Sequence, residues 1–240
     1  MYDMQHPTPR QPDKWPVNKI TESFWHDFYA RGRLQHQAAS PFAVFCLENC
    51  FSEKTRILEF GCGNGRDSFS FLHYKIPVLA VDGCEVAICA NNDKYKKGKA
   101  LAPGRFIALD FAKIETLPVR SMTGINTVYS RFVLHAIPEP LETRLLDFSW
   151  EILPPGGRMF HEFRTTRDPL MKKGEVIGPF ERLTDHYRRF VNTETFREKL
   201  MAKGWNELFF KEGFGLAVLG NDDPFVARIV VEKPKEQTCQ

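Results

Sequence analysis

The stretch RILEFGCGNGRDS, from Arg56 to Ser68, decides the fold. The short apolar run ILEF is stopped by three glycines in five positions, and RDSFSFLHYK then places apolar residues at helical spacing. This order predicts a strand, a glycine turn and a helix. Glycines leave the backbone bare, and the first amides of a helix point at whatever is bound there. We therefore expect the principal ligand site at this turn.

The remainder of the chain repeats the alternation of short apolar runs and helical patterns. PVLAVDG, RFIALDF and INTVYSRFVLHAI are the next strands, and the chain counts four strand–helix rounds up to the end of the helix LETRLLDFSWEIL at residue 153. GRMFHEFR is a fifth strand, ETFREKLMAKG a helix, and WNELFFKEGFGL and FVARIVVEK are the last two strands. The order predicts an α/β, Rossmann-like sheet of seven strands, mostly parallel, with helices on both faces and an antiparallel last strand.

The sequence before the glycine turn predicts a loosely ordered lead-in and a helical segment. Residues 1–18 are rich in proline and are expected to be flexible. Two helices are expected within residues 19–50, the second opened by a Ser40 cap with Pro41 at its first position. We interpret residues 19–240 as one domain, with a helical lid at 19–50 and a Rossmann-like core at 51–240.

Composition restricts the class of protein. Of 240 residues, 42% are hydrophobic, no apolar run approaches a membrane span, and no signal pattern opens the chain, so we expect a cytoplasmic protein. The six cysteines form no C-x-x-C pair, so no metal site is expected. A net charge of +3 is small for a nucleic-acid binder, and the basic cluster DKYKKGKA at 93–100 is interpreted as a solvated helix end.

Two common phosphate-binding loops do not fit the glycine turn. A nucleoside triphosphate loop needs Lys and then Ser or Thr after its last glycine, where this chain has Arg66 and Asp67. The dinucleotide fingerprint is G-x-G-x-x-G, whereas this turn is G-x-G-x-G and follows an acid, Glu59. A carboxylate there would repel a pyrophosphate but suits a ligand with a positive amino group.

Two further acids end the next strands. Asp82 ends the second strand, where a carboxylate can accept both hydroxyl groups of a ribose. Asp110 ends the third strand and precedes Phe111, a position suited to the amino edge and the flank of an adenine. An acid at the end of a strand can instead cap the turn that follows, which leaves a structural alternative for each acid.

ILEFGCGNG, AVDG and ALDF resemble the successive motifs of class I S-adenosylmethionine-dependent methyltransferases. The resemblance covers residues 55–165 in motif and the whole chain in the order of strands and helices, including a reversed seventh strand. It implies that S-adenosylmethionine is the cofactor. It also implies that the methionine part lies along Gly61, Gly63 and Gly65, the amino group near Glu59, the ribose on Asp82, and the adenine by Asp110 and Phe111.

The acceptor is expected beside the carboxyl ends of the fourth and fifth strands. His135 follows Arg131 by four residues and is expected on a short helix facing the cleft, while DHYRRF supplies further polar side chains. His135 and His186 are the candidate bases, and a structural hydrogen-bonding role is the alternative for each. The candidate catalytic residues are Arg131, His135, Glu162, Arg164, His186, Tyr187 and Arg188.

The arginines allow two interpretations. Arg131, Arg164, Arg188 and Arg189 could clamp an anionic acceptor, or they could pair with Glu162, Asp168 or Asp185 in a structural network. YSRFVLHAIPEP lacks the Asn/Asp-Pro-Pro-aromatic motif of methylases that modify nucleic-acid amino groups. More weakly, the chain resembles small bacterial-type methyltransferases that tailor sugars, lipids or natural products, which implies a small-molecule or glycan-like acceptor. We expect methylation at oxygen, with nitrogen or a carboxyl group as the alternatives.

Aromatic residues of the predicted lid, Trp25, Tyr29 and Phe42, are suited to cover a sulfonium, since cation–π attraction is worth about 0.5–2 kcal/mol. A plain core role is the alternative for these rings. Two other functions stay open at this point. One is a catalytically silent, methyltransferase-shaped binding protein, and the other is a nicotinamide-dependent oxidoreductase, which Glu59 and the glycine spacing disfavour.

Overall fold

The computed structural model describes residues 16–32, 38–99, 101–119, 122 and 124–235. The expected flexibility of residues 1–15 therefore lies outside the described residues, and the first helix already begins at Pro16. The helices are α1 (Pro16–Ala30), α2 (Pro41–Asn49), α3 (Arg66–His73), α4 (Glu85–Lys97), α5 (Glu139–Ile152) and α6 (Thr193–Ala202), with short 3-10 helices η2 (Phe111–Thr116) and η4 (Pro169–Lys172).

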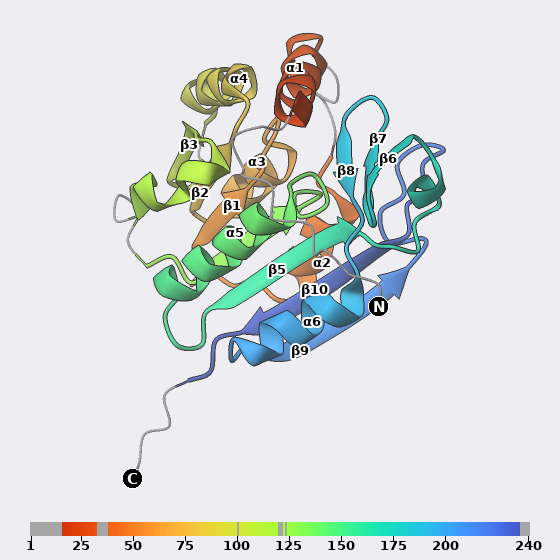
Figure 1. Cartoon of the computed structure of the whole chain (residues 1–240). Coiled ribbons are helices and arrows are strands. Elements are labelled where there is room, and N and C mark those ends of the chain that lie inside the picture. Colours follow the sequence, from red (N-terminus) through yellow and green to blue (C-terminus); the bar gives the residue numbers. More distant parts are fainter. Residues whose placement is uncertain (1–15, 33–37, 100, 120–121, 123, 236–240) are drawn as a thin grey trace, which may run out of the picture.

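A seven-stranded sheet forms the centre of the molecule (Figure 1). Its strands are β1 (Ile57–Phe60), β2 (Val78–Asp82), β3 (Gly104–Ala108), β4 (Thr127–Arg131), β5 (Arg158–Arg164), β9 (Asn206–Gly213) and β10 (Val226–Glu232). Their order is β3-β2-β1-β4-β5-β10-β9, and β10 runs antiparallel to both of its neighbours. The predicted fold class, with its reversed last strand, is confirmed.

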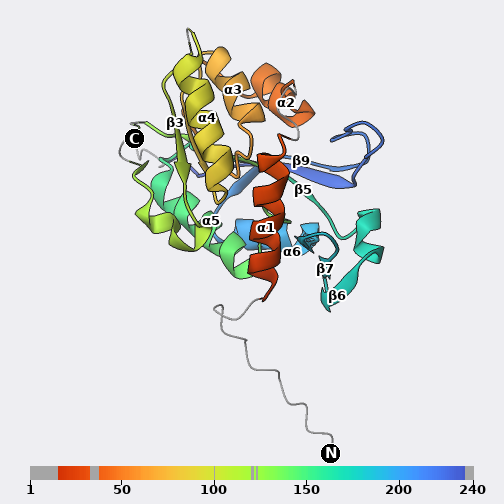
Figure 2. The same ribbon diagram turned by 90° about the horizontal axis from the view of Figure 1, so that it is seen from above.

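Both faces of the sheet are covered by helices, as Figure 2 shows from above. Strand side chains alternate between the two layers. Leu58 of β1 and Val128 of β4 belong to the apolar cluster that also includes α5 and α6, whereas Ile57 and Tyr129 face the cluster of α2, α3 and α4. Burial on both faces explains why these strands read as continuous apolar runs in the sequence.

The strand order reverses between β1 and β4, because the chain builds β2 and β3 on one side of β1 and then crosses to the other. In open sheets of this kind, ligands bind in the crevice at the carboxyl ends of the strands flanking such a reversal. The glycine turn after β1 stands at that crevice. Helix α1 lies across this end of the sheet and contacts α4 at one side and β8 (Tyr187–Arg189) at the other (Figure 2).

Three features differ from the sequence predictions. The third strand is followed by the 3-10 helix η2 instead of a full helix, and residues 132–137 after β4 form turns, so His135 is not helical. A small antiparallel sheet of β6 (Glu175–Gly178), β7 (Glu181–Leu183) and β8 was not predicted. Its strands are three or four residues long, too short for an alternating pattern to be visible.

None of the described helices is long and apolar enough to cross a membrane.

Candidate active site

The glycine turn adopts a backbone that side chains would obstruct. Gly61, Gly63 and Gly65 have φ angles of 68°, 50° and 73°, in the left-handed region that favours glycine. A Cβ on Gly61 would lie 2.2 Å from a methyl group of Val133, and one on Gly63 would lie 2.2 Å from the hydroxyl of Tyr29. The turn is therefore packed between the segment after β4 and helix α1, and Gly63 and Gly65 are buried.

Asp82, at the end of β2, is bound to this turn. One carboxylate oxygen accepts a 2.7 Å hydrogen bond from the amide of Gly63, and the other accepts a 2.8 Å bond from the amide of Cys84. Burial raises the pKa of Asp82, while the two amide hydrogen bonds oppose that rise. Each carboxylate oxygen has a second lone pair, so the group can still accept the two hydroxyls of a ribose.

Glu59 lies behind the turn and is almost fully buried, with 3% of its surface exposed. The Ser68 hydroxyl donates a hydrogen bond to its carboxylate. Burial, together with the nearby charge of Asp67, raises the pKa of Glu59 to about 8, although the Ser68 bond acts in the opposite direction. A cation bound beside Glu59 would favour its ionised form, which fits the expected place of an amino group.

Asp110 caps the helix that follows it. Its carboxylate accepts a 2.8 Å hydrogen bond from the amide of Ala112, at the first turn of η2. Asp110 itself is exposed, and the ring of Phe111 packs edge-on against Phe60, with the ring centres 6.0 Å apart. The capping alternative is thus realised, and Phe111 stays partly exposed.

Asp67 is an important residue that the sequence reasoning missed. It is buried and accepts hydrogen bonds from the amide and hydroxyl of Ser40, at 2.8 and 2.7 Å, and from the hydroxyl of Tyr129 at 2.8 Å. These bonds fasten the start of α2 and strand β4 to the first turn of α3. The signal available in the sequence was the apolar environment around an acid at a helix N-terminus, where acids are favoured.

Helix α1 contributes aromatic rings to the mouth of the crevice. Tyr29 stacks on Trp25 with ring centres 5.9 Å apart, and burial beside Asp82 raises the pKa of its hydroxyl well above the usual range. Phe24 stacks on His186 at 4.2 Å. Phe42, by contrast, is fully buried against Tyr129. The core alternative therefore applies to Phe42, and α2 packs on the sheet instead of forming part of a lid.

Glu162 joins two arginines at the ends of β4, β5 and β10. Its side chain is fully buried and accepts hydrogen bonds from Arg131 at 2.9 Å and from Arg228 at 2.7 Å. The strand register places these three residues opposite one another. Burial raises the pKa of Glu162, and the two guanidinium groups oppose the rise. The side chain of Arg131 is 16% exposed and so remains partly open to the crevice.

Phe132, directly after β4, has a left-handed backbone with a φ of 61°. A bulky residue is rare in this region, and such strain tends to be kept where function requires it. Its ring lies 4.2 Å from the guanidinium carbon of Arg131 and 5.0 Å from the ring centre of His135. The strained residue thus brings an aromatic face to the polar side chains between β4 and β5.

Both candidate bases are buried and neutral at neutral pH. The Nδ1 atom of His135 accepts a 3.1 Å hydrogen bond from the amide of Arg164. Burial is the main cause that holds the pKa of His135 well below its usual range, and the charges of Arg164 and Arg188 add to it. Burial and Arg188 also lower the pKa of His186, to about 4. Its Nδ1 lies 3.1 Å from Asp185, at an angle unsuited to a hydrogen bond.

Carboxylates accompany the four arginines that the sequence singled out. Arg164 binds Asp168 at 2.9 Å and Asp222 at 2.7 Å, and Arg188 binds Asp185 at 2.8 Å. The remaining pairs are Arg131 with Glu162 and Arg189 with Glu142. Tyr187 is also engaged, because its hydroxyl donates a 2.6 Å bond to Glu181. The structural-network interpretation of these arginines is therefore realised.

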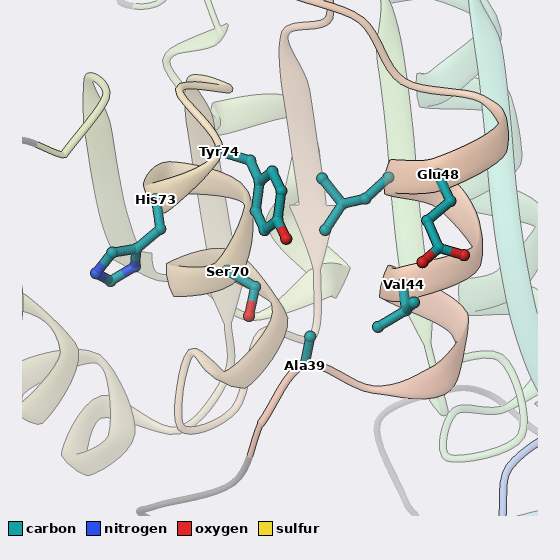
Figure 3. A pocket seen from close by; sticks show the side chains of 7 residues that line it. Ala39, Val44, Glu48, Ser70, His73 and Tyr74 are labelled. Carbon is teal, nitrogen blue, oxygen red and sulfur yellow. The ribbon is translucent and has the colours of Figure 1, made fainter.

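A hollow of about 460 Å³ lies away from this site, between α2 and α3 (Figure 3). Val44 and Glu48 line it from α2, Ser70 and His73 line it from α3, and Tyr74 lines it from directly after that helix. None of the described side chains proposed for cofactor or acceptor lines it. Among the residues that the structure describes, no group of three or more His, Cys, Asp or Glu side chains could hold a metal ion.

The residues at the crevice fit an adenosyl sulfonium. The glycine turn presents bare backbone, Asp82 retains lone pairs for hydroxyl groups, and buried Glu59 is suited to a positive amino group. The strand order and this set of acids define the fold of a Rossmann-like, S-adenosylmethionine-dependent methyltransferase.

Comparison with known proteins agrees with this class. Residues 29–218 match the profile of a family described as "Methyltransferase domain", and the chain belongs to that family. It is an S-adenosylmethionine-dependent methyltransferase, as predicted. No match is found among curated proteins. The family match excludes the alternative of a nicotinamide-dependent oxidoreductase.

Solved structures share the fold at low sequence identity. An S-adenosylmethionine-dependent methyltransferase of Methanosarcina mazei is 15% identical and has a TM-score of 0.62, over 79% of this chain and 97% of that one. The 1,6-didemethyltoxoflavin-N1-methyltransferase of Burkholderia thailandensis is 17% identical and has a TM-score of 0.64, over 94% and 93%. The glycopeptide N-methyltransferase MtfA, complexed with S-adenosylmethionine, is 16% identical and has a TM-score of 0.60, over 82% and 95%.

Proposed function

We propose that this enzyme transfers a methyl group from S-adenosylmethionine to a small polar acceptor, a small molecule or a glycan, at oxygen. The observation that carries the proposal is the set of acids at three neighbouring strands around the glycine turn, Glu59, Asp82 and Asp110. When bound, S-adenosylmethionine supplies an electrophilic methyl group on a sulfonium. The acceptor atom must lie in line behind that methyl group.

Each cofactor-binding residue has a proposed role. Glu59 takes the amino group, and Asp82 takes the ribose hydroxyls while holding the turn through the amide of Gly63. Gly61 and Gly65 keep the backbone bare. Asp110 and Phe111 flank the adenine from the end of β3, and Trp25 and Tyr29 cover the cleft from α1.

The acceptor is proposed to lie beside Arg131, Phe132 and His135. Because Nδ1 of His135 already accepts a bond from the amide of Arg164, the neutral ring carries its proton on Nε2 and can donate a hydrogen bond to the acceptor. His186 is the stronger candidate base, since the carboxylate of Asp185 near Nδ1 favours a proton there and leaves Nε2 free to accept one. Because an oxygen becomes strongly acidic as it is methylated, a base with a pKa of about 4 can take its proton at that stage.

The remaining candidates are proposed to position the site. Glu162 holds Arg131, and Arg164 presents the amide that orients His135. Tyr187 and Arg188 place His186 through the β8 strand, whose Tyr187 amide donates a 3.3 Å bond to Thr21 of α1. The carboxylate partners of the arginines reduce the gain from an anionic acceptor, so the proposal requires only a polar one.

Proteins with related folds support the proposed class of acceptor, since they methylate a small molecule and a glycopeptide. The proposed target atom, oxygen, differs from theirs. The toxoflavin and glycopeptide enzymes act on nitrogen. A screen of hydroxylated and amino-bearing small molecules and glycans, read by mass spectrometry for the gain of one methyl group, tests both class and atom. Methylation at nitrogen alone would contradict the oxygen assignment.

Calorimetry separates catalysis from mere association. We expect S-adenosylmethionine and its demethylated product, S-adenosylhomocysteine, to bind at the same single site. Tight binding of the product without turnover on any acceptor would favour the silent binding protein. The five described cysteines are free thiols, which agrees with the proposed cytoplasmic setting.

A further inference from the structure

A groove of about 610 Å³ runs between α3 and α4, on the outer side of the glycine turn. Its lining includes Asn64 of the glycine turn, Tyr29 of α1, and Gly98 and Leu101 from the segment after α4. Glu59, Asp82, Asp110 and Phe111 are not among its lining residues, so the groove is separate from the proposed cofactor cleft although Tyr29 touches both.

The walls of the groove are apolar and its rim is positively charged. Phe69, Val86, Ala90 and Leu101 line the floor. Volume and lining both fall within the range of small-molecule sites, which are mostly apolar with a few placed polar groups.

Two lysines on this rim come from the basic cluster at 93–100. The ammonium of Lys94 lies 4.1 Å from the centre of the Phe69 ring, and partial burial lowers the pKa of Lys94. Lys97 makes no ion pair with any residue of the described ranges. The one acid on the rim, Asp93, lies 3.7 Å from Lys96. The rim therefore carries an excess of positive charge beside the apolar side chains of the groove.

We propose that this groove is a second binding site, which takes an aromatic carboxylate or a similar flat monoanion. The ring of the ligand packs on Val86, Ala90 and Leu101, and its anionic group meets the ammonium groups of Lys94 and Lys97. The basic cluster is thus part of a binding site as well as a solvated helix end.

Occupation of the groove is expected to strengthen cofactor binding. Asn91, on the groove wall, donates a 2.8 Å hydrogen bond to the carbonyl of Gly63, and Tyr29 covers the same glycine. A ligand packed against both side chains stabilises the turn in the conformation that the structure shows. Because coupling is reciprocal, the cofactor must strengthen anion binding by the same factor.

The test uses 2-naphthoate as the probe and its uncharged analogue 2-naphthamide, both measured by calorimetry on the full chain. We expect one naphthoate site, with at least about tenfold weaker binding of the amide. The double variant Lys94→Gln/Lys97→Gln should weaken naphthoate binding by about tenfold or more. The matched double variant Lys113→Gln/Lys211→Gln removes the same charge elsewhere and should leave it unchanged.

A second pair of variants tests the location. Ala90→Glu places a like charge in the groove and should abolish naphthoate binding, whereas Ala90→Gln has the same size and should weaken it less. S-adenosylhomocysteine binding, measured on each variant, reports that the fold is intact. The proposal is overturned if naphthoate does not bind at millimolar concentration, if the lysine and Ala90 variants bind it normally, or if S-adenosylhomocysteine displaces it stoichiometrically. Failure of the methyl-transfer proposal would leave these results unchanged.

Discussion

Asp82 accepts a 2.7 Å hydrogen bond from the amide of Gly63, and so the end of β2 holds the glycine turn that follows β1. The same carboxylate is the proposed partner of the ribose. One side chain therefore both shapes the turn and provides acceptors for the ligand, and its two tasks can be separated by measuring stability and affinity on the same variant.

Replacing Asp82 with Ala should weaken S-adenosylhomocysteine binding by about 10–100-fold, because hydrogen bonds to a charged acceptor are worth about 1.5–3 kcal/mol. Calorimetry gives the affinity, and urea denaturation gives the cost of leaving the amides of Gly63 and Cys84 without their acceptor. Glu151→Ala, at an exposed position of α5, is the control. Unchanged affinity in Asp82→Ala would exclude the ribose role.

Glu59 should make cofactor binding dependent on pH. Its pKa of about 8 means that it is protonated near pH 7 before binding, and a bound amino group favours the ionised form. Binding should release a proton near pH 7, and affinity should rise with pH up to about 8. Calorimetry in buffers of different ionisation enthalpy measures this release, and Glu59→Gln should abolish it.

The same raised pKa predicts an effect on stability. Between the ordinary value of 4.5 and about 8, the folded chain holds a proton that the unfolded chain has lost. The contribution of Glu59 to the free energy of unfolding should therefore decrease as pH rises through this window. Urea denaturation at several pH values should show a smaller decrease for Glu59→Gln, and an identical pH profile would contradict the buried, protonated state.

Gly63→Ala should destabilise the enzyme by about 1–3 kcal/mol, because it strains a left-handed backbone and brings a Cβ within 2.2 Å of the Tyr29 hydroxyl. Tyr29→Ala removes the second cause but not the first. In a double-mutant cycle, the two changes should couple by at least about 0.5 kcal/mol. Gly65→Ala meets Phe69 and Asn91 instead, so its effect should simply add to that of Tyr29→Ala.

Asp67 should be important for stability. Asp67→Ala leaves three donors of Ser40 and Tyr129 without their acceptor and should cost about 3 kcal/mol or more, since each buried unsatisfied group costs about 1–3 kcal/mol. Tyr129→Phe should cost about 1 kcal/mol in the native background and almost nothing in the Asp67→Ala background. Equal costs in both backgrounds would show that the hydroxyl acts independently of Asp67.

Local sequence signals predicted the fold correctly where each element carries its own pattern. The apolar run of β1, the glycines after it and the Ser40 cap with Pro41 are all read within a few residues, and the Ser40 hydroxyl does accept a 3.0 Å bond from the amide of Ala43. The alternation of strands and helices predicted a doubly covered sheet, and burial on both faces agrees with the continuous apolar character of its strands.

The site was less predictable, because its contacts join distant segments. Arg228 and Glu162 are 66 positions apart, and Arg189 and Glu142 are 47 apart. Charge alone indicated that arginines gather at these strand ends, but the choice between a free clamp and a paired network depends on strand register, which a single sequence does not fix. The β6–β8 sheet was missed for a related reason, since strands of three or four residues depend on their neighbours for stability.

Phe132 and Lys75 are the two non-glycine residues of the described ranges with positive φ, at 61° and 64°. Lys75 lies in an exposed turn after α3, so glycine there should raise the melting temperature without affecting turnover. Glycine at Phe132 would relieve the same kind of backbone tension but remove the ring beside Arg131. Attempts to make this enzyme more thermostable can therefore start at Lys75. At Phe132, by contrast, any rise in melting temperature is expected to be accompanied by a loss of turnover.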